Sequence, residues 1–451
     1  MKIKFCGADK EVTGSCHLLE INNKKILIDC GMFQGTNFNA GKNYDDFLFN
    51  PEEIDFLLLT HAHLDHCGRI PKLVKQGFEG KIYTTKGTSE LANLIWEDAY
   101  SIMKYNNKKF DYPVLYNPSD IKKAKQLFVG VGYNQEIKLD KDLKIVFKDA
   151  GHIFGSAFIE IYFEGKKIVF SGDIGNENVP ILRDTEKLEN VDYLICESTY
   201  GDRIHEKSSE RKKIILDLIK QGVNDGGTIM IPAFSLERTQ EFLYELNNLA
   251  EYEKALPNIP IFLDSPLAIK ATKVYGKYPE YYDQEAKELH DAGDDFFDFK
   301  NLEMTCKKRE SKKINRLKGS KMIIAGAGMM NGGRILHHAC RYLSDPRSTL
   351  IIVGYQAHGT LGRKIYNGEK RVRVMHQMLD VNCHVKAIGA LSAHGDQKKI
   401  LDWIDNTKTS IKKVFYVHGE KRAIESLSNE TKKRFENLEV VAPEEGDEFE
   451  I

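Results

Sequence analysis

The chain has 451 residues, of which 65 are lysine or arginine and 66 are aspartate or glutamate, so its formal net charge is −1. This length exceeds what one simple core accommodates, and we therefore expect two domains. The balanced charge argues against a nucleic-acid binder whose whole surface is basic, although it is compatible with a local basic groove.

Cysteine usage and the start of the chain both favour the cytoplasm. The eight cysteines stand singly without a C-x-x-C pair, which argues against a thiolate zinc motif and a disulfide framework and suits a reducing compartment. The first residues, Met-Lys-Ile-Lys-Phe-Cys-Gly, enter a strand-like pattern without a signal-peptide core. No apolar run approaches the roughly 18 residues of a membrane span. We therefore expect a soluble, cytoplasmic protein that does not contact a membrane.

The first 200 residues predict short strands separated by turns. The apolar run at 56–59, Phe-Leu-Leu-Leu, is typical of a strand that is buried on both faces. A helix is expected at 67–76, directly after it. The strand candidates in this part lie at 2–6, 17–21, 25–29, 56–60, 143–148, 157–163, 166–170 and 193–196.

Beyond residue 200 the pattern changes to strands that alternate with helices. Such repetition of βα units predicts a parallel sheet. Further strand patterns follow at 381–388 and 413–417. The expected strand–helix pairs are 228–232 with 235–249, 261–263 with a helix that opens near Pro266, and 322–325 with 334–343.

Four potential metal ligands fall within six positions of the stretch Thr-His-Ala-His-Leu-Asp-His-Cys-Gly at 60–68. Residues i and i+2 of an extended segment point to the same side, so His61 and His63 can share one metal ion. Asp65 and His66 lie further round the turn, where they face a second ion. Nitrogen and oxygen ligands without cysteine indicate a catalytic metal site and not a closed structural one.

Each ion needs further ligands, and two residues that follow predicted strands are candidates. His152 lies in Asp-Ala-Gly-His, and Asp173 lies in Phe-Ser-Gly-Asp. A carboxylate at Asp173 could bridge two ions roughly 3.5–4 Å apart, a separation at which a shared water is activated near neutral pH. Gly-His and Gly-Asp are also ordinary turn pairs, so either residue alone is compatible with a structural role.

The histidine cluster resembles that of the metallo-β-lactamase superfamily, together with Asp29 in Leu-Ile-Asp-Cys-Gly, His152 in Gly-His-Ile-Phe-Gly-Ser-Ala and Asp173 in Ser-Gly-Asp-Ile-Gly. The resemblance implies an α/β fold, the αββα sandwich that holds two metal ions between its sheets. The superfamily includes lactamases, glyoxalases, flavin-linked diiron proteins and nucleases, so the fold alone does not decide the chemistry. Histidine and not glutamate at position 63 disfavours the diiron branch and favours zinc.

Motifs in the second half resemble those of the β-CASP nucleases, which include RNase J and the endonuclease that cuts eukaryotic pre-mRNA before polyadenylation. This family inserts a second, parallel-sheet α/β domain into the metallo-β-lactamase fold. The resemblance implies a metallo-β-lactamase part at 1–204, an inserted β-CASP domain at 205–375 and a returning part at 376–451. The motifs are Cys-Glu-Ser-Thr-Tyr-Gly at 196–201, Pro-Ala-Phe-Ser-Leu-Glu-Arg-Thr-Gln at 232–240, Asp-Ser-Pro-Leu-Ala at 264–268, the stretch 325–333, Leu-Ser-Ala-His-Gly-Asp at 391–396 and Val-His-Gly-Glu at 417–420.

The resemblance places Glu197, His394 and His418 at the family's motifs A, B and C. His394, held by Glu197, would protonate the leaving sugar oxygen, since a carboxylate keeps an imidazole protonated near neutral pH. Asp65 is implied to be catalytic as well as a ligand, and Asp29 to support the ligands. The implied cofactors are two Zn²⁺ ions per chain, with Mn²⁺ as the alternative. The first ion would take His61, His63, His152 and Asp173, and the second would take Asp65, His66, Asp173 and His418.

Several residues of the inserted domain are candidates for holding a polyanion. The glycine-rich turn at 326–333, with Gly328, Gly332 and Gly333, opens a helix, and its N–H groups could cradle a phosphate or simply connect strand to helix. Ser235 is expected to cap the helix that carries Arg238. The guanidinium of Arg238 could grip a phosphate or pair with a nearby acid.

Three further features could affect substrate binding. His358 stands where family members often have glutamate, which would alter substrate contact or local packing. The basic run at 307–321 could line a cleft, but such runs are more often a solvated helix face. Phe234 and Tyr355 could stack on bases, although core packing is the more common role of such side chains.

The resulting hypothesis is a zinc-dependent phosphodiesterase that cleaves RNA, preferably single-stranded, in RNA processing or decay, with DNA as an open alternative. The chain ends soon after motif C and lacks the extra domains of RNase J and of the archaeal proteins, which favours an endonuclease. One alternative is a hydrolase of small thioesters, lactones or lactams, which would need neither the inserted domain nor His394 and His418. Another is a non-catalytic partner subunit, which predicts broken metal motifs. A homodimer is also compatible with the sequence.

Overall fold

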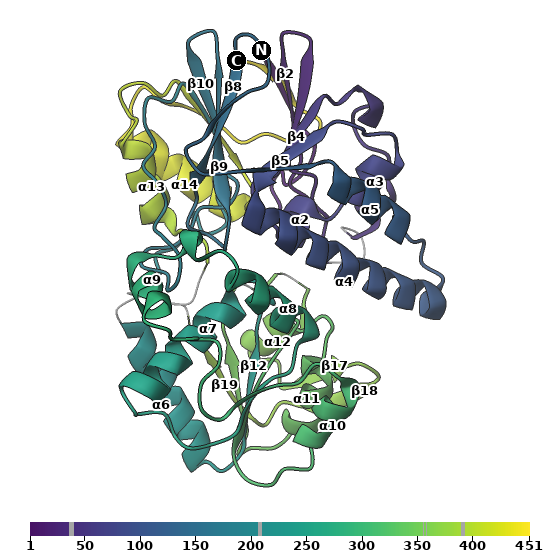
Figure 1. Ribbon diagram of the computed structural model, residues 1–451, viewed down its shortest axis with the longest axis vertical. Helices are drawn as coiled ribbons and strands as arrows, with labels where there is room; N and C mark the ends of the chain where they lie inside the picture. The colour runs from purple at the N-terminus through teal and green to yellow at the C-terminus, as the bar shows by residue number, and fades with distance from the viewer. Residues whose placement is uncertain (36–39, 206–209, 355, 358, 389–392) are drawn as a thin grey trace. The chain divides into compact units, whose positions relative to one another are not determined.

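The computed structural model describes the chain except residues 36–39, 206–209, 355, 358 and 389–392. Its internal contacts divide the described chain into two compact units, each built from separate stretches (Figure 1). Unit 1 comprises Met1–Glu177, Asp184–Ile204 and His394–Ile451. Unit 2 comprises Asn178–Arg183 and His205–Ala393, so it includes residues 376–393, which the sequence assigned to the returning part of the first domain.

Unit 1 contains two seven-stranded sheets. The first has the order β22 (Glu448–Glu450), β1 (Lys2–Phe5), β2 (His17–Ile21), β3 (Lys24–Ile28), β4 (Phe56–Leu58), β5 (Lys81–Thr85) and β6 (Phe128–Val131). The second has the order β21 (Glu439–Val441), β20 (Lys413–Val417), β11 (Tyr193–Glu197), β10 (Lys166–Phe170), β9 (Ala157–Phe163), β8 (Leu143–Asp149) and β7 (Glu136–Lys138). The strands predicted for the first 200 residues match these within two residues at each end.

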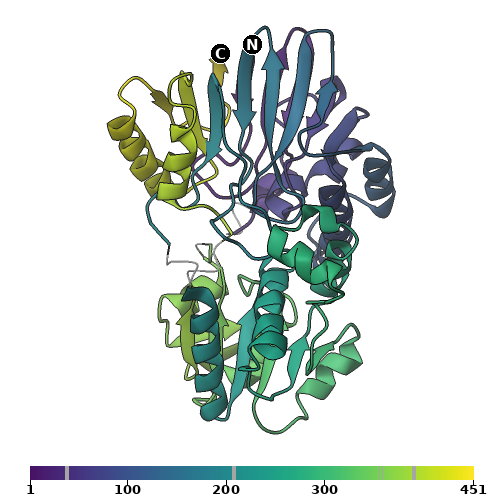
Figure 2. The same ribbon diagram turned by 60° about the vertical axis from the view of Figure 1, so that its left-hand side comes forward.

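The two sheets pack face to face over one apolar core. Strand β1 alternates partly exposed lysines with buried Ile3 and Phe5, as a half-buried strand does. The ring of Phe5 lies 5.3 Å from that of Phe415 in the opposite sheet, measured between centroids. Figure 2 shows both chain ends together, where β22 pairs antiparallel with β1.

Helices cover the outer face of each sheet in unit 1 (Figure 1). This arrangement confirms the α/β fold class and its αββα sandwich. The helix expected at 67–76 divides into two at Gly68 and Arg69, and two helices that follow it were not expected. The helices are α2 (Leu64–Cys67), α3 (Ile70–Lys75), α4 (Lys86–Phe110) and α5 (Pro118–Gln126) on one side, and α13 (Gln397–Asp405) and α14 (Lys421–Arg434) on the other.

Unit 2 is built on one six-stranded sheet in which every pair of neighbouring strands is parallel. Its order is β14 (Leu302–Met304), β13 (Ile261–Leu263), β15 (Lys321–Ala325), β12 (Thr228–Pro232), β16 (Thr349–Ile352) and β19 (His384–Ala387). The parallel sheet confirms the prediction from βα repetition. The central strands are buried throughout, as strands covered on both faces must be.

The remaining elements of unit 2 connect these strands. An antiparallel pair, β17 (Arg371–Val374) and β18 (Gln377–Asp380), precedes the last strand. The helices are α6 (Arg211–Asn224), α7 (Arg238–Asn247), α8 (Pro266–Tyr275), α9 (Gln284–Asp291), α10 (Lys308–Ile314), α11 (Ile335–Tyr342) and α12 (Leu361–Tyr366). Among the described residues of either unit, no helix has both the length and the apolar character that crossing a membrane requires.

Candidate metal centre

Strand ends of unit 1 bring the candidate residues together. Strands β3, β4 and β5 are parallel neighbours, and so are β10, β11 and β20, so the carboxyl ends within each set meet at one edge of their sheet. The loops at these ends carry most of the candidate ligands and the residues that hold them. In chain order these are Asp29 after β3, His61, His63, Asp65 and His66 after β4, His152 after β8, Asp173 after β10, Glu197 at the end of β11 and His418 after β20.

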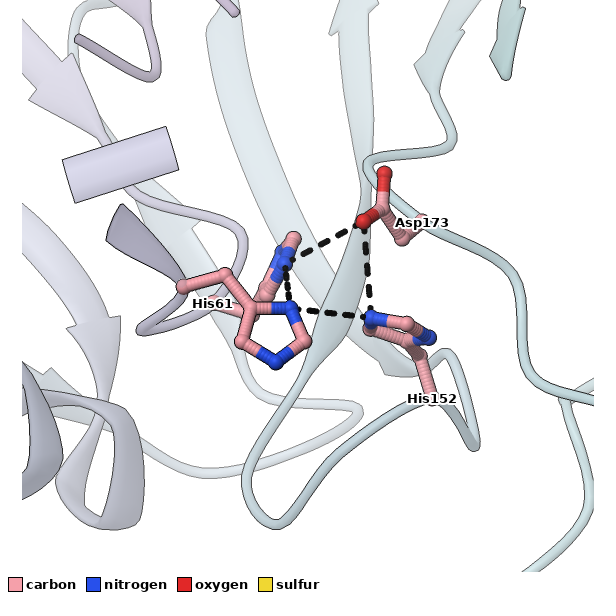
Figure 3. A group of neighbouring side chains, drawn as sticks. His61, His152 and Asp173 are labelled. Atoms are coloured by element: carbon pink, nitrogen blue, oxygen red, sulfur yellow. Dashed lines mark hydrogen bonds and ion pairs between the residues drawn. The ribbon is translucent and has the colours of Figure 1, made fainter. Parts of the chain in front are cut away.

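The first group consists of His61, His63, His152 and Asp173, whose ligand atoms all lie within 4.8 Å of one another. Figure 3 shows His61, His152 and Asp173 pointing towards one another from separate loops. Oδ2 of Asp173 lies 3.4 Å from Nε2 of His61 and 3.4 Å from Nε2 of His152. Nδ1 of His63 lies 3.1 Å from Nε2 of His61 and 3.2 Å from Nε2 of His152. Four lone-pair donors therefore converge on one point.

The second group consists of Asp65, His66 and His418. Here the other oxygen of Asp173, Oδ1, lies 3.3 Å from Nε2 of His66 and 3.0 Å from Nδ1 of His418. Nε2 of His418 lies 3.1 Å from the carbonyl oxygen of Val12, which it can reach as a donor, so Nδ1 keeps its lone pair for the group. Asp173 thus stands between the two groups and presents one oxygen to each.

The donor atoms of both groups fit divalent metal ions. Among the described residues, Oδ1 of Asp173, Nε2 of His66 and Nδ1 of His418 are buried and form no hydrogen bond. Buried polar atoms are normally paired, and lone pairs that converge without a donor between them suit a cation. Histidine nitrogens and carboxylate oxygens are ligands that Zn²⁺ and Mn²⁺ both accept.

Asp29 orients two residues of this centre, Thr60 and His66, through hydrogen bonds. Its φ of +57° turns the chain at the end of β3. The carboxylate accepts hydrogen bonds from the backbone N–H and the hydroxyl of Thr60, both at 2.8 Å, and its Oδ2 lies 2.7 Å from Nδ1 of His66. Nδ1–H of His66 therefore donates to Asp29 and leaves Nε2 for the second group. Thr60, whose hydroxyl also lies 3.0 Å from Nδ1 of His61, was not singled out from the sequence, although it adjoins the cluster.

Burial and charge set different protonation tendencies within the centre. Burial lowers the pKa of His61, His63 and His152, and neighbouring imidazoles lower it further. These three rings therefore tend to be neutral, which is the form that binds a metal ion. Burial also lowers the pKa of His66, but the charges of Asp173 and Asp29 outweigh it and hold that pKa well above its usual value. The negative surroundings of His66 favour a cation at its Nε2.

Glu197 and His394 form a pair beside the first group. Nδ1 of His394 lies 3.2 and 3.1 Å from the two carboxylate oxygens of Glu197. Glu197 is fully buried and accepts hydrogen bonds from the backbone N–H groups of Ile174 at 2.6 Å and Thr199 at 3.3 Å. Burial lowers the pKa of His394, but the charges of Glu197 and Asp173 raise it more, so the net pKa is above its usual value. The pair therefore holds a proton close to the metal ligands.

The glycine-rich turn of unit 2 is packed closely. Gly333 has a φ of +74°, and a side chain there would place its Cβ 2.1 Å from the carbonyl oxygen of Gly326. A Cβ at Gly328 would lie 2.6 Å from the ring of Phe234, whereas a Cβ at Gly332 would meet no atom of the described residues within 4 Å. Close packing explains the first two glycines, and the third leaves open space.

The structure places the two polar candidates near this turn in different environments. Ser235 does not cap α7, because the helix begins at Arg238 after a turn in which Glu237 has a φ of +66° and no side chain caps the end. The hydroxyl of Ser235 instead lies 3.4 Å from that of Ser265. Arg238 is buried and forms an ion pair with Glu241, one turn further along the helix. Of the two roles expected for Arg238, the structure shows the pairing with an acid.

His358 and Tyr355 fall outside the described residues. The basic run at 307–321 contains α10 and is largely exposed, with Ile314 and Lys321 as its buried residues, which fits a solvated helix face.

Comparisons with known families cover most of the chain. Residues 9–217 match the Metallo-beta-lactamase superfamily, residues 239–365 match the Beta-Casp domain, and residues 378–443 match the Zn-dependent metallo-hydrolase RNA specificity domain. A solved structure described as a protein of unknown function from Enterococcus faecalis V583 covers 99% of both chains with a TM-score of 0.58 and 11% identity, which supports the fold alone.

Curated relatives match over nearly the full length. Ribonuclease TTHA0252 of Thermus thermophilus is 38% identical over 95% of each chain. An RNase J-like protein of Methanocaldococcus jannaschii is 32% identical over 93% of this chain and 92% of its own. Transcription termination factor FttA of the same organism is 31% identical over 93% of this chain and 67% of its own. The chain belongs to the β-CASP nucleases of the metallo-β-lactamase superfamily, a family of metal-dependent hydrolases.

Proposed function

We propose that the protein is a zinc-dependent ribonuclease that cleaves single-stranded RNA internally. The observation that carries this proposal is the position of Asp173, whose two oxygens face two separate groups of ligand atoms while the Glu197–His394 pair adjoins it. Two adjacent ligand groups with a proton donor beside them suit hydrolysis of a phosphodiester, in which charge develops on several oxygens. The similarity to relatives named as ribonucleases and the match of residues 378–443 to an RNA specificity domain support RNA as the substrate.

The first ion would be held by His61, His63, His152 and Asp173, and the second by Asp65, His66, Asp173 and His418. Bound at these groups, two Zn²⁺ ions would supply Lewis acidity towards the phosphate oxygens and lower the pKa of an attacking water. Mn²⁺ would fit the same nitrogen and oxygen donors.

The protein's own residues would handle the proton of the leaving group. Glu197 accepts at Nδ1 of His394, so Nε2 is the nitrogen that donates to the leaving sugar oxygen. The raised pKa of His394 keeps the ring protonated for this step. Asp65, at the edge of the second group and partly exposed, would help to orient the attacking water. In unit 2, the backbone N–H groups of the glycine-rich turn, Gly328, Gly332 and Gly333 among them, would contact phosphates of the substrate, with Ser235 as a further donor.

A circular single-stranded RNA tests both the activity and the mode of cleavage, because it has no ends for an exonuclease. Zinc-reconstituted protein should linearise the circle, lose activity with a chelator and regain it with Zn²⁺ or Mn²⁺. A circle that stays intact while a linear RNA of the same sequence is degraded would replace internal cleavage by exonuclease action. If both the circular and the linear RNA stay intact while a thioester is hydrolysed, the small-molecule hydrolase would be favoured. A circular DNA of the same sequence measures the preference for ribose.

The role of His394 is tested by His394→Ala. The variant should lose at least about a hundredfold in cleavage rate, as expected for removal of a general acid, while its metal content stays at two ions per chain. The matched control is His290→Ala, a partly exposed histidine on α9 in unit 2, which should cleave at the normal rate. Unchanged cleavage by His394→Ala would remove the proton-donor role.

A further inference from the structure

The longest helix of unit 1, α4, has a buried first half and an exposed second half. In its second half and the turn after it, four large apolar or aromatic side chains are more than half exposed: Ile102 (55%), Tyr105 (61%), Phe110 (51%) and Tyr112 (52%). Single exposed hydrophobic residues are common, but a group at one helix end indicates a surface that binds something. The buried residues of the first half are Gly87, Thr88, Leu91, Ala92, Trp96 and Ala99.

The segment that carries these aromatic side chains is rich in lysine. Residues 100–126 contain six lysines and two aspartates, a net charge of +4 in a chain whose total is −1. One of the aspartates, Asp120, is buried in the cap of α5, which packs against α4. All six lysines are exposed. They are Lys104, Lys108 and Lys109 on α4 and Lys122, Lys123 and Lys125 on α5.

The aromatic side chains are held in place and do not belong to a loose tail. Asp111 adopts a left-handed conformation that ends the helix and donates its N–H to the carbonyl of Asn107 at 2.8 Å. The Asn107 amide donates to the carbonyl of Tyr112 at 2.8 Å. Nζ of Lys109 lies 4.9 Å from the ring centroid of Phe110 and 5.6 Å from that of Tyr105. Aromatic faces and ammonium groups therefore alternate on one fixed surface.

We propose that this surface, the α4 tip, made of Lys104, Tyr105, Lys108, Lys109, Phe110 and Tyr112, binds single-stranded RNA outside the metal centre. Exposed aromatic rings stack on bases of any sequence, and interleaved lysines contact the phosphates. A second copy of the chain is a poor occupant, because a twofold contact would bring the same lysines of both copies together. The choice of RNA over another polyanion as the ligand of this surface rests on the proposed function.

Helix α4 connects the α4 tip to the metal centre. The hydroxyls of Thr85 and Thr88, at the start of the helix, donate to the carbonyl of Gly155 at 2.6 and 2.8 Å, and Gly155 lies three residues after the ligand candidate His152. A helix of 25 residues spans about 37 Å at 1.5 Å per residue. The α4 tip therefore meets the RNA several nucleotides away from the scissile bond and acts on long substrates only.

Two sets of substitutions separate stacking from charge. The aromatic variant combines Tyr105→Ala, Phe110→Ala and Tyr112→Ala. It should raise the Kd for a fluorescent 30-nucleotide RNA about tenfold or more. Lys104→Gln with Lys108→Gln and Lys109→Gln should reduce the salt dependence of log K by about 2, the value for three lost phosphate contacts on a single strand. Binding is measured on protein with the additional change His394→Ala, so that the RNA stays intact. Tyr105→Phe with Tyr112→Phe keeps the rings and should bind normally.

The matched control removes three lysines elsewhere in unit 1. The three are Lys81, Lys138 and Lys141, which are also exposed. Lys81 is the first residue of β5, and α4 begins directly after the last residue of that strand. The change of all three lysines to glutamine should alter neither the affinity nor the salt dependence. All substituted side chains are exposed, so melting temperatures should match that of the unaltered chain.

Cleavage assays distinguish failure of this proposal from failure of the proposed function. Cleavage is measured on protein that keeps His394. The aromatic variant should then lose about tenfold in kcat/KM on the 30-nucleotide RNA and nothing on a 6-nucleotide RNA or on bis(p-nitrophenyl) phosphate. Normal RNA binding and cleavage by both α4-tip variants would overturn the proposal and leave the ribonuclease intact. An equal loss on the short and long RNA would also overturn it. Loss of binding to anionic lipid vesicles, with RNA binding unchanged, would assign the surface to a membrane and overturn it too.

Discussion

The two oxygens of Asp173 face different imidazoles, and this arrangement makes the residue more consequential than any single histidine. Asp173→Asn keeps the size of the side chain but removes the charge from both ligand groups. Substitution of a residue that only hydrogen-bonds to a metal ligand typically reduces metal affinity about 10–100-fold. We therefore expect a larger loss of metal affinity for Asp173, which faces both groups. Elemental analysis after dialysis should show fewer than one retained ion in Asp173→Asn.

Single-group variants provide the comparison. His63→Ala and Asp65→Asn each remove a residue from one group only, and each should retain about one ion. If the Asp173→Asn variant retained two ions and cleaved RNA normally, Asp173 would not be a ligand shared by the two groups.

A second residue-scale prediction concerns Asp9, in the loop whose neighbour Ala8 accepts a hydrogen bond from the backbone N–H of His418. Burial raises the pKa of Asp9 to about 8, and the charge of Glu445 adds to the rise. The unfolded value is about 3.9, so between the two values the folded protein holds a proton that the unfolded chain releases. The contribution of Asp9 to stability is therefore complete below pH 4 and is lost as the pH rises to 8.

Asp9→Asn mimics the protonated carboxyl at every pH. Its stability advantage over the unaltered chain should grow by up to about 1.4 kcal/mol per pH unit across this interval. Melting temperatures at pH 5 and pH 8.5 measure the difference. Glu11→Gln serves as the control, since Glu11 pairs with Lys42 at 2.8 Å and should gain nothing from neutralisation. An Asp9→Asn advantage that is the same at both pH values would refute the assignment.

At the scale of elements, the segment after β3 packs directly on α2, which carries Asp65 and His66. A Cβ on Gly31 would lie 1.5 Å from the carbonyl oxygen of Asp65. Gly31→Ala should therefore displace α2, lower the stability of unit 1 by at least about 1–3 kcal/mol, the usual effect of overpacking, and reduce metal content at the second group. Denaturant unfolding and elemental analysis check the two effects.

Gly41 is the matched control, because a Cβ there meets no atom within 4 Å in the part of the chain that the structure describes, and its φ is −60°. Gly41→Ala should be neutral or slightly stabilising, by about 0.4–1 kcal/mol. A Gly31→Ala variant that is as stable as Gly41→Ala would show that the loop can move aside without affecting the ligands.

Most strands of the first 200 residues and the ligand cluster could be predicted from the sequence because their signals are local, whereas β5, β6 and β7 were not expected. Alternation of lysine with Ile3 and Phe5 fixes β1, and the spacing of His61 to His66 identifies the first ligands without any tertiary information. The partner of Arg238 was left open, although Glu241, three positions along a helix, is the neighbour that helical geometry supplies.

The helices that the sequence analysis missed or misplaced have separate physical reasons. Helix α4 buries apolar residues only along its first half, whereas Ile102, Tyr105 and Phe110 in its second half are exposed, so no single apolar face continues along its length. The helix expected at 67–76 fails for a different reason. The segment that carries Asp65 and His66 is already helical, and its C-cap at Gly68 separates it from α3.

At the scale of the whole molecule, the chain leaves unit 1 after Ile204 and returns to it at His394. The departing segment carries Glu197, and the first residue of the returning segment is the histidine that pairs with it. An isolated bridge between Gly175 and His394 and a hydrogen bond from the N–H of Gly395 to the carbonyl of Ile174 fix this return point. Within unit 1, the residues on both sides of this break are therefore held beside the proton donor, and insertions next to His394 should affect its alignment before they affect the metal ligands.

The separate cores of the two units give the last prediction, on metal removal. One apolar cluster of unit 1 lies between its two sheets and another lies on the outer face of the second sheet, whereas a cluster of unit 2 packs on one face of its own parallel sheet. Ions bound to folded unit 1 stabilise it by about 2.7 kcal/mol when their concentration is a hundred times Kd. Chelation should therefore lower the melting transition of unit 1 and leave that of unit 2 unchanged.

Hydrogen exchange locates the effect without separating the units. On chelation, amides of β4, α2 and β10 should exchange faster, because buried Asp173 and the converging histidines lose the cations that compensate them. Amides of β12 and β15, in the centre of the unit 2 sheet, should exchange at the same rate with and without the chelator. Faster exchange spread equally over both sheets would show that the ions stabilise the molecule as one cooperative body, and exchange unchanged in both would show that no ion is bound at the Asp173 groups.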